Sequence, residues 1–216
     1  FFRRALGSPE AQAARDFLTQ RGFTQEHATQ FGLGYAPQGW SHLLDHLRQK
    51  GFRDEELRAS GLVSEGQRGL YDRFRGRLLW PIRDMTGATI GFGARKLYDD
   101  DPGPKYLNTP ETPLYKKSQV LYGIDLAKRT IAKERQLVLV EGYTDVMAAH
   151  LAGVGTVEVA REAGELQPRQ ARVGAAESVV ASFLPDCIFH VDINLTHATE
   201  PDRRGGRRSA ASGSGG

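Results

Sequence analysis

The fold class is decided by one short stretch, LVLVEGYTDVM at residues 137–147. Its first four residues form a continuous apolar run, which is typical of a strand buried on both faces. A turn follows at Glu141-Gly142, and residues 144–151 have helical periodicity up to a stop at Gly153. A second apolar run, at 154–159, fits a parallel strand. Strand, helix and strand within about twenty residues predict a right-handed crossover, and therefore an α/β sheet.

The residues before this stretch predict a mixed subdomain in which helices precede strands. Capping residues and apolar spacing predict four short helices between residues 8 and 59. Apolar residues then recur at every second position across 77–97, on both sides of a turn at 84–87, which predicts a β-hairpin; they are Leu78, Trp80 and Ile82 before the turn and Ile90, Phe92 and Ala94 after it. Residues 99–113 contain four prolines and no apolar period, so we expect an irregular loop, and such long loops are often functional.

Composition excludes several classes of protein. Apolar residues make up 39% of the 216 residues, and no apolar run approaches the ~18 residues of a membrane-spanning helix. The single cysteine, Cys187, excludes an intramolecular disulfide and a zinc site of clustered cysteines. The chain starts at Phe1 without an initiator methionine or a signal-peptide apolar region. We therefore expect a cytoplasmic protein that contacts no membrane, and a fragment whose true start lies upstream.

The net charge of +3 combines two unequal parts. The balance of basic over acidic residues is +6 across residues 1–140 and −3 across residues 141–216. A basic part followed by a mildly acidic one suits a protein that holds a polyanion in one region and metal ions in another. On charge alone, an ordinary solvated surface is the simpler explanation.

Two carboxylates lie at the end of the predicted buried strand. Glu141 follows the strand at its carboxyl end, the edge where open α/β sheets bind ligands, so it can hold Mg²⁺ or act as an acid or base. Asp145 lies in the first turn of the next helix and can join it, because hard cations prefer oxygen ligands. Spacing alone equally fits a solvated loop carboxylate followed by an aspartate that the helix dipole favours.

Cations and aromatic residues concentrate on the hairpin and the loop after it. A groove for a single nucleic-acid strand needs this mixture, because guanidinium groups pair with phosphate while rings stack on bases. We expect Arg73, Arg75 and Arg77 to share one face of an extended segment. A solvated strand face with arginines that reach toward water remains an equal alternative. The stretch comprises Arg68, Tyr71, Arg73, Phe74, Arg75, Arg77, Arg95, Lys96, Lys105, Tyr106, Asn108, Tyr115, Lys116 and Lys117.

At these residues the sequence resembles bacterial DnaG-type DNA primases. The motifs that carry the resemblance occur in order over residues 1 to about 156, and together they are highly specific. They are YDRFRGR at 71–77, WPIRD at 80–84, IGFGAR at 90–95, PKYLNTPET at 104–112, LYG at 121–123 and VEGYTDV at 140–146.

The resemblance implies both a fold and an activity. It implies a basic α+β subdomain over residues 1–130, followed by the start of a Toprim α/β unit at 131–160. Members of this family are nucleotidyltransferases of the primosome, which use Mg²⁺ or Mn²⁺ and ribonucleoside triphosphates to make short RNA primers on single-stranded DNA. Their zinc-binding domain and the domain that binds the replicative helicase have no counterpart in this sequence, so we expect no zinc here.

The resemblance also assigns roles to individual residues. Glu141 corresponds to the Toprim glutamate at the metal and catalytic centre, and Asp145 to the aspartate that follows it. The positions that match the family's template groove and nucleotide path are Arg75, Arg77, Arg95, Lys105, Tyr106, Asn108 and Lys117.

The sequence departs from the family after the predicted Toprim helix. The family's Asp-Gly-Asp strand, whose aspartates carry the metal ions, has no counterpart, and Asp192 after FHV at 189–191 is the nearest substitute. Residues 161–216 cannot be aligned, which suggests divergence or a shifted reading frame, with a disordered end rich in Arg, Gly, Ser and Ala. We therefore expect impaired polymerisation. A non-catalytic single-strand-binding module, or another Toprim protein such as a nuclease or topoisomerase, is the alternative.

Overall fold

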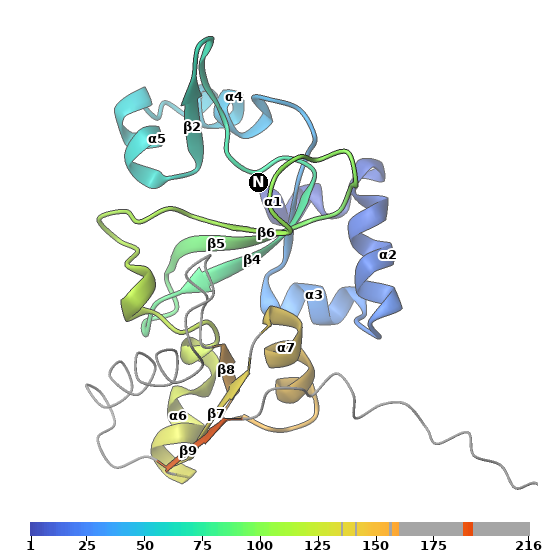
Figure 1. Ribbon diagram of the computed structural model, residues 1–216, viewed down its shortest axis with the longest axis vertical. Coiled ribbons are helices and arrows are strands. Elements are labelled where there is room, and N and C mark those ends of the chain that lie inside the picture. Colours follow the sequence, from blue (N-terminus) through green and yellow to red (C-terminus); the bar gives the residue numbers. More distant parts are fainter. Residues whose placement is uncertain (135, 141, 156, 160–187, 192–216) are drawn as a thin grey trace, which may run out of the picture.

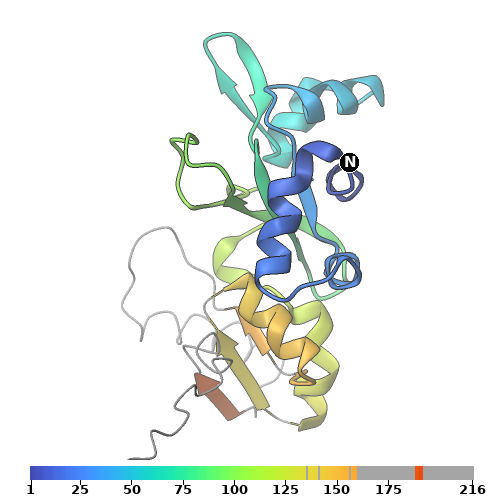
Figure 2. The ribbon, with the colours of Figure 1, turned by 90° about the vertical axis from the view of Figure 1, so that its right-hand side faces the viewer.

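The computed structural model describes residues 1–134, 136–140, 142–155, 157–159 and 188–191. An antiparallel sheet flanked by helices lies above a smaller unit of parallel strands and helices (Figure 1). The second view shows the two sheets stacked along the long axis of the molecule (Figure 2). The predicted combination of an α+β part and an α/β part is confirmed.

The first part begins with short helices. They are α1 (Phe2–Ala5), the 3₁₀ turn η1 (Pro9–Ala11), α2 (Gln12–Gln20), α3 (Gln25–Phe31), α4 (His42–Gln49) and α5 (Asp54–Ser60). The start of α3 is fixed by Thr24, whose hydroxyl accepts a hydrogen bond from the backbone N–H of His27. Its end is fixed by Gly32 at φ 72°, a conformation that favours glycine. The four helices predicted between residues 8 and 59 are confirmed, whereas α1 was not predicted.

The main sheet has the strand order β1-β4-β5-β6, and every pair is antiparallel. Its strands are β1 (Gly34–Ala36), β4 (Arg77–Arg83), β5 (Thr89–Lys96) and β6 (Tyr106–Asn108). The hairpin predicted over 77–97 is therefore confirmed, and Asp84 closes its turn by accepting hydrogen bonds from Thr86 and Ala88. A separate hairpin of β2 (Val63–Gly66) and β3 (Gly69–Asp72) was not predicted.

The second part contains the stretch from which the fold class was inferred. After the turn η2 (Lys117–Gln119) come α6 (Ile124–Glu134), β7 (Gln136–Val140), α7 (Tyr143–Leu151), β8 (Val157–Val159) and β9 (Ile188–Val191). The strand order is β8-β7-β9, and β7 is parallel to both neighbours. The predicted strand–helix–strand crossover is confirmed, with the central strand buried between two others.

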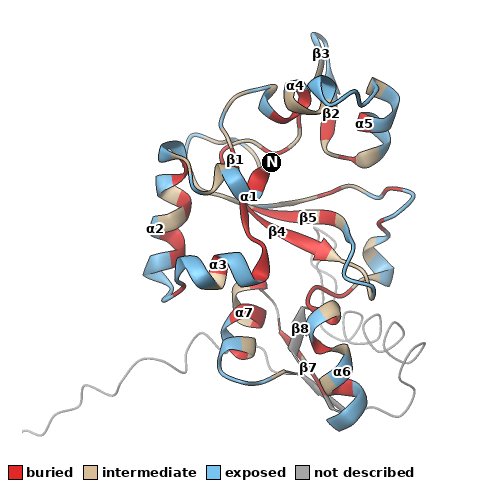
Figure 3. Cartoon of the chain, turned by 180° about the vertical axis from the view of Figure 1, so that it is seen from behind, coloured by how far each residue is buried: buried red, intermediate tan, exposed pale blue. Residues whose placement is uncertain are grey.

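One hydrophobic core joins the two parts. It includes Phe17 and Leu18 of α2, Trp80 of β4, and Val146 and Met147 of α7. The indole N–H of Trp80 points at the sulfur of Met147, 3.2 Å away, across the boundary between the two sheets. Buried residues are concentrated in β4 and β5 and on the inward faces of the surrounding helices (Figure 3). Within the described part of the chain, no helix has the length and apolar character needed to cross a membrane.

Candidate nucleic-acid interface

The three arginines of the YDRFRGR motif bind three different sets of partners. Arg73 donates through Nε and Nη2 to the backbone oxygen of Asn108, and Arg75 donates to that of Asp72. Arg77 is 3% exposed and pairs with Asp101. The prediction of one shared face is wrong, because the backbone leaves the extended conformation between β3 and β4 and Gly76 adopts φ 58°.

Arg75 belongs to an exposed aromatic cluster. Its guanidinium lies 4.3 Å from the ring centroid of Trp40 and 5.1 Å from that of Tyr71. The two rings pack edge to face at 5.5 Å, and Trp40 is 66% exposed. Sequence reasoning missed Trp40, because it is a single aromatic residue in a loop without periodicity. An exposed ring held by a guanidinium is a surface on which a base can stack. We call these three residues the Trp40 platform.

Asp72 fixes this platform from below. Its buried carboxylate accepts hydrogen bonds from the backbone N–H groups of Leu43 and Leu44, at 2.8 and 2.9 Å, at the start of α4. Its own N–H donates to the backbone oxygen of Trp40 at 2.7 Å. Burial raises the pKa of Asp72, and the two bonds from α4 oppose that rise. The loop that carries Trp40 is thus tied to β3 on one side and to α4 on the other.

A second cationic cluster lies beside β5 and β6. The guanidinium groups of Arg21 and Arg95 lie 3.8 and 4.0 Å from the ring centroid of Phe17. Burial lowers the pKa of Arg21, and the charge of Arg95 lowers it further. Among the described residues, neither guanidinium forms an ion pair with a carboxylate, and Nε of Arg95 is buried without a hydrogen-bond partner.

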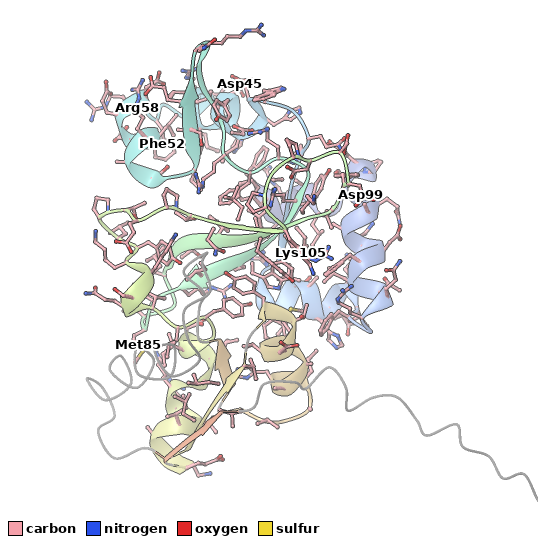
Figure 4. The ribbon with its side chains drawn as sticks, in the orientation of Figure 1. Asp45, Phe52, Arg58, Met85, Asp99 and Lys105 are labelled. Carbon is pink, nitrogen blue, oxygen red and sulfur yellow. The ribbon has the colours of Figure 1, made fainter. Side chains whose placement is uncertain are left out.

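Lys105 and Tyr106 complete this cluster at the start of β6. Tyr106 is 44% exposed, and the ammonium of Lys105 lies 5.9 Å from its ring centroid. The position of Lys105 at the return of the β5–β6 loop can be followed in Figure 4. We call Arg21, Arg95, Lys105 and Tyr106 the β5–β6 cationic cluster. Two guanidinium groups that pack on one ring, neither of them paired with a carboxylate among the described residues, form a site that favours an anion such as phosphate. Sequence reasoning missed Arg21, which lies on no predicted basic stretch.

The other predicted groove residues have structural partners. Asn108 accepts a hydrogen bond at Oδ1 from the hydroxyl of Tyr143, at 2.9 Å, and its backbone oxygen accepts the two bonds from Arg73. Lys117 is half-buried at η2, and its backbone N–H donates to the carboxylate of Glu111. The structure therefore brings together Arg95, Lys105 and Tyr106, and places the other four predicted residues elsewhere.

Of the predicted catalytic carboxylates, only Asp145 lies among the described residues. Glu141 and Asp192 lie outside the described residues. Asp145 accepts a hydrogen bond from the N–H of Gly142 at 3.0 Å, so it caps the first turn of α7. The strands that precede Glu141 and Asp192 in the chain, β7 and β9, are adjacent and parallel, and their carboxyl ends share one sheet edge. In the described ranges, no group of three His, Cys, Asp or Glu side chains is placed to hold a metal ion.

Comparison with known proteins decides the family. Residues 1–128 match the model of the N-terminal domain of the DNA primase catalytic core. The chain belongs to the DnaG-type primase family. A DNA primase of Streptomyces coelicolor is 68% identical over 148 residues, which are 68% of this chain and 23% of that protein. The chain thus spans about a quarter of the length of such curated relatives.

Solved primase structures share the fold. The RNA polymerase domain of Mycobacterium tuberculosis DnaG, in complex with double-stranded DNA that has a six-nucleotide overhang, superposes with a TM-score of 0.78 at 49% identity. The match covers 88% of this chain and 59% of that one. A DnaG catalytic domain bound to single-stranded DNA gives a TM-score of 0.71 at 32% identity, over 89% of this chain and 56% of that one. The predicted primase resemblance is confirmed.

Proposed function

We propose that this chain is the template-binding part of a primase catalytic core and that single-stranded DNA lies along the β5–β6 cationic cluster and the Trp40 platform. The observation that carries the proposal is the pair of guanidinium groups of Arg21 and Arg95, held on Phe17 without a carboxylate partner among the described residues. The DNA complexes of related domains support it. Phosphates would pair with the cluster, while exposed rings would stack on bases.

The activity that fits this family is the synthesis of short RNA primers from ribonucleoside triphosphates. In this proposal the chain consists of one subdomain, residues 1–130, followed by a Toprim unit that starts near residue 131. Glu141 would hold Mg²⁺ or Mn²⁺, and Asp192 would be its nearest partner, because their preceding strands share an edge. Such ions, when bound, supply charge compensation for the triphosphate. Arg95 and Lys105 would orient the anionic substrate. In the complete protein, the replicative helicase would be a partner, and the work would take place at cytoplasmic replication forks.

We infer that the 216-residue chain polymerises poorly. Phosphoryl transfer requires metal ions that neutralise developing charge, and Glu141 with one capping aspartate offers few oxygens for two ions. A primer-synthesis assay on single-stranded DNA with Mg²⁺ or Mn²⁺ should therefore give no product. Robust synthesis would show that Asp192 or another carboxylate replaces the missing pair. Binding of DNA without synthesis would favour the non-catalytic alternative.

The DNA-binding proposal is tested by salt dependence. We expect the double substitution Arg21→Ala and Arg95→Ala to weaken binding of a labelled single-stranded oligonucleotide. Fluorescence anisotropy at salt concentrations from about 50 to about 300 mM would measure this. The slope of log K against log salt should flatten by about 1.4, because each lost phosphate contact removes about 0.7 for single strands. Arg58→Ala is the matched control, since Arg58 pairs with Glu65 on the surface and belongs to neither of the two proposed DNA-binding clusters. An unchanged slope in the double variant would contradict the assignment of Arg21 and Arg95 as phosphate-binding residues.

A further inference from the structure

The loop between β5 and β6, residues 97–105, carries one member of the cationic cluster, Lys105, and leads directly into another, Tyr106 at the start of β6. The loop is too long for a tight hairpin and contains Pro102 and Pro104, so its course needs contacts outside the two strands. Its ends are joined by a hydrogen bond from the N–H of Lys96 to the backbone oxygen of Lys105, at 2.9 Å. Figure 4 shows Asp99 on the outer arm of the loop and Lys105 at its return.

Arg77 holds the middle of this loop from the neighbouring strand β4. Its Nη2 donates to Oδ2 of Asp101 at 2.6 Å, and its Nη1 donates to the backbone oxygen of Pro104 at 2.9 Å. Asp101 is held from two more sides. Its Oδ1 accepts from the N–H of Gly103 at 2.7 Å, and its backbone oxygen accepts from the ammonium of Lys96 at 3.1 Å. We call this arrangement the Arg77–Asp101 clip.

The geometry of the clip leaves no room for a phosphate. The side chain of Arg77 is 3% exposed, and that of Asp101 is 23% exposed. A side chain at Gly103 would begin 2.7 Å from Nη2 of Arg77, so the loop backbone lies directly on the guanidinium. An incoming phosphate would have to break the ion pair and leave the carboxylate of Asp101 without its partner, which is a costly state for a half-buried charge.

We propose that Arg77 and Asp101 are positioning residues, which hold Lys105 and Tyr106 beside Arg21 and Arg95 and do not themselves contact nucleic acid. The inference rests on the proposed function of the cluster and goes beyond it, because it reverses the role that the motif suggested for Arg77. It also explains why an aspartate occurs in a loop that borders a site for a polyanion.

The two roles predict opposite signs for one substitution. If Arg77 bound phosphate, removing the negative charge of Asp101 would free it and tighten DNA binding. If the clip positions the loop, Asp101→Ala and Arg77→Ala weaken binding by similar factors, because both leave Lys105 and Tyr106 to be ordered on binding. The expected factor is about five to a hundred, from the cost of ordering two side chains. The double variant should bind no more weakly than either single variant, because both remove one unit.

The matched control is Asp99→Ala in the same loop. Asp99 is exposed and lies outside the clip, so its removal should leave binding of the single-stranded oligonucleotide unchanged or slightly tighter. Asp101→Asn keeps the shape of the side chain and serves if the alanine variant does not fold. Tighter or unchanged binding by both Asp101 variants would overturn the proposal.

A second measurement does not depend on DNA. Hydrogen–deuterium exchange followed by mass spectrometry should show faster exchange across residues 97–105 in Arg77→Ala and Asp101→Ala, and wild-type exchange in Asp99→Ala. Equal protection in all four proteins would refute the clip. If the wild-type chain does not bind DNA, the proposed function fails, and the exchange experiment still decides whether the clip holds the loop.

Discussion

The contact between Gly93 and Tyr143 gives the sharpest stability prediction. Gly93 lies in β5 opposite Trp80 of β4 and Asn108 of β6. A Cβ atom at this position would lie 2.1 Å from the hydroxyl oxygen of Tyr143 and 2.2 Å from its Cζ, whereas real Cβ contacts are essentially never shorter than 3.0 Å. The backbone of Gly93 does not require glycine, so the substitution Gly93→Ala acts through space alone.

The magnitude follows from what the phenol ring would lose. The ring stacks on Trp80 with centroids 5.3 Å apart and planes at 12°, an arrangement that contributes about 0.5–1.5 kcal/mol. Its hydrogen bond to Asn108 contributes about 0.5–1.5 kcal/mol, and forcing an extra methyl into a packed core costs about 1–3 kcal/mol. We expect Gly93→Ala to lower the free energy of unfolding by about 2–6 kcal/mol, which corresponds to a fall in Tm of about 5–20 °C.

Thermal unfolding followed by circular dichroism measures this, with Gly91→Ala as the matched control. Gly91 lies in the same strand, but its nearest neighbours for a new Cβ are atoms of Thr109 at 3.3 Å, so a small adjustment accommodates it. In a Tyr143→Ala background the ring is gone, and Gly93→Ala should then cost little. The reasoning is refuted if Gly93→Ala unfolds at the same temperature as Gly91→Ala, or if its full cost persists without the ring.

Three further predictions concern single side chains. Asp72→Ala leaves two backbone N–H groups of α4 without an acceptor, so it should lower the free energy of unfolding in urea by about 2–5 kcal/mol. Asp45→Ala, on the exposed side of α4, should lower it far less. Equal losses would contradict the capping role of Asp72. Hydrogen bonds from Thr86 lower the pKa of Asp84, so this carboxylate stabilises the fold above its ordinary pKa of 3.8, and the contribution is lost as pH falls through the lowered value. Asp84→Asn should therefore lose less stability toward acid, which unfolding midpoints measured from about pH 3 to about pH 7 would show. Identical pH profiles of the two proteins would contradict this prediction. Trp40→Ala should weaken binding of single-stranded DNA by about five- to a hundredfold. The slope of log K against log salt should not change, because stacking releases no counterions. A changed slope would argue against a stacking role.

The parts of the fold that were predicted from sequence are those that local patterns specify. The run at 137–140 is apolar without interruption, so a buried strand is its natural state, and Gly153 ends the following helix at φ 87°. The hairpin of β4 and β5 is marked by apolar residues on both sides of its turn, although residues 77–82 of β4 are all buried and do not alternate between a buried and an exposed face. The hairpin of β2 and β3 has no such mark, because Val63 is its one buried apolar residue and its outer face is solvated.

The site was harder to predict, because its contacts join residues that are far apart in the sequence. Arg21, the residue just after α2, and Arg95 of β5 pack on the same ring of Phe17, and no periodicity in the sequence indicates this shared contact. The alternation of Arg73, Arg75 and Arg77 was misleading for a different reason. Alternation implies one face only where the backbone is extended, and Gly76 interrupts the extension at φ 58°.

The same long-range packing fixes the start of α7. Glu141 is joined through Gly142 to Tyr143, whose ring is held by Trp80 and Tyr122 and whose hydroxyl is bonded to Asn108. Asn108 is two residues from Tyr106 in the strand that borders the cationic cluster. Tyr143, two residues after the proposed metal ligand in the chain, is thus hydrogen-bonded to a residue that lies two positions after the proposed template-binding residue Tyr106. Because buried aromatic contacts of this kind resist small displacements, the sheet that would hold the template also fixes the start of α7, and a boundary near residue 130 would divide the chain in topology but not in packing.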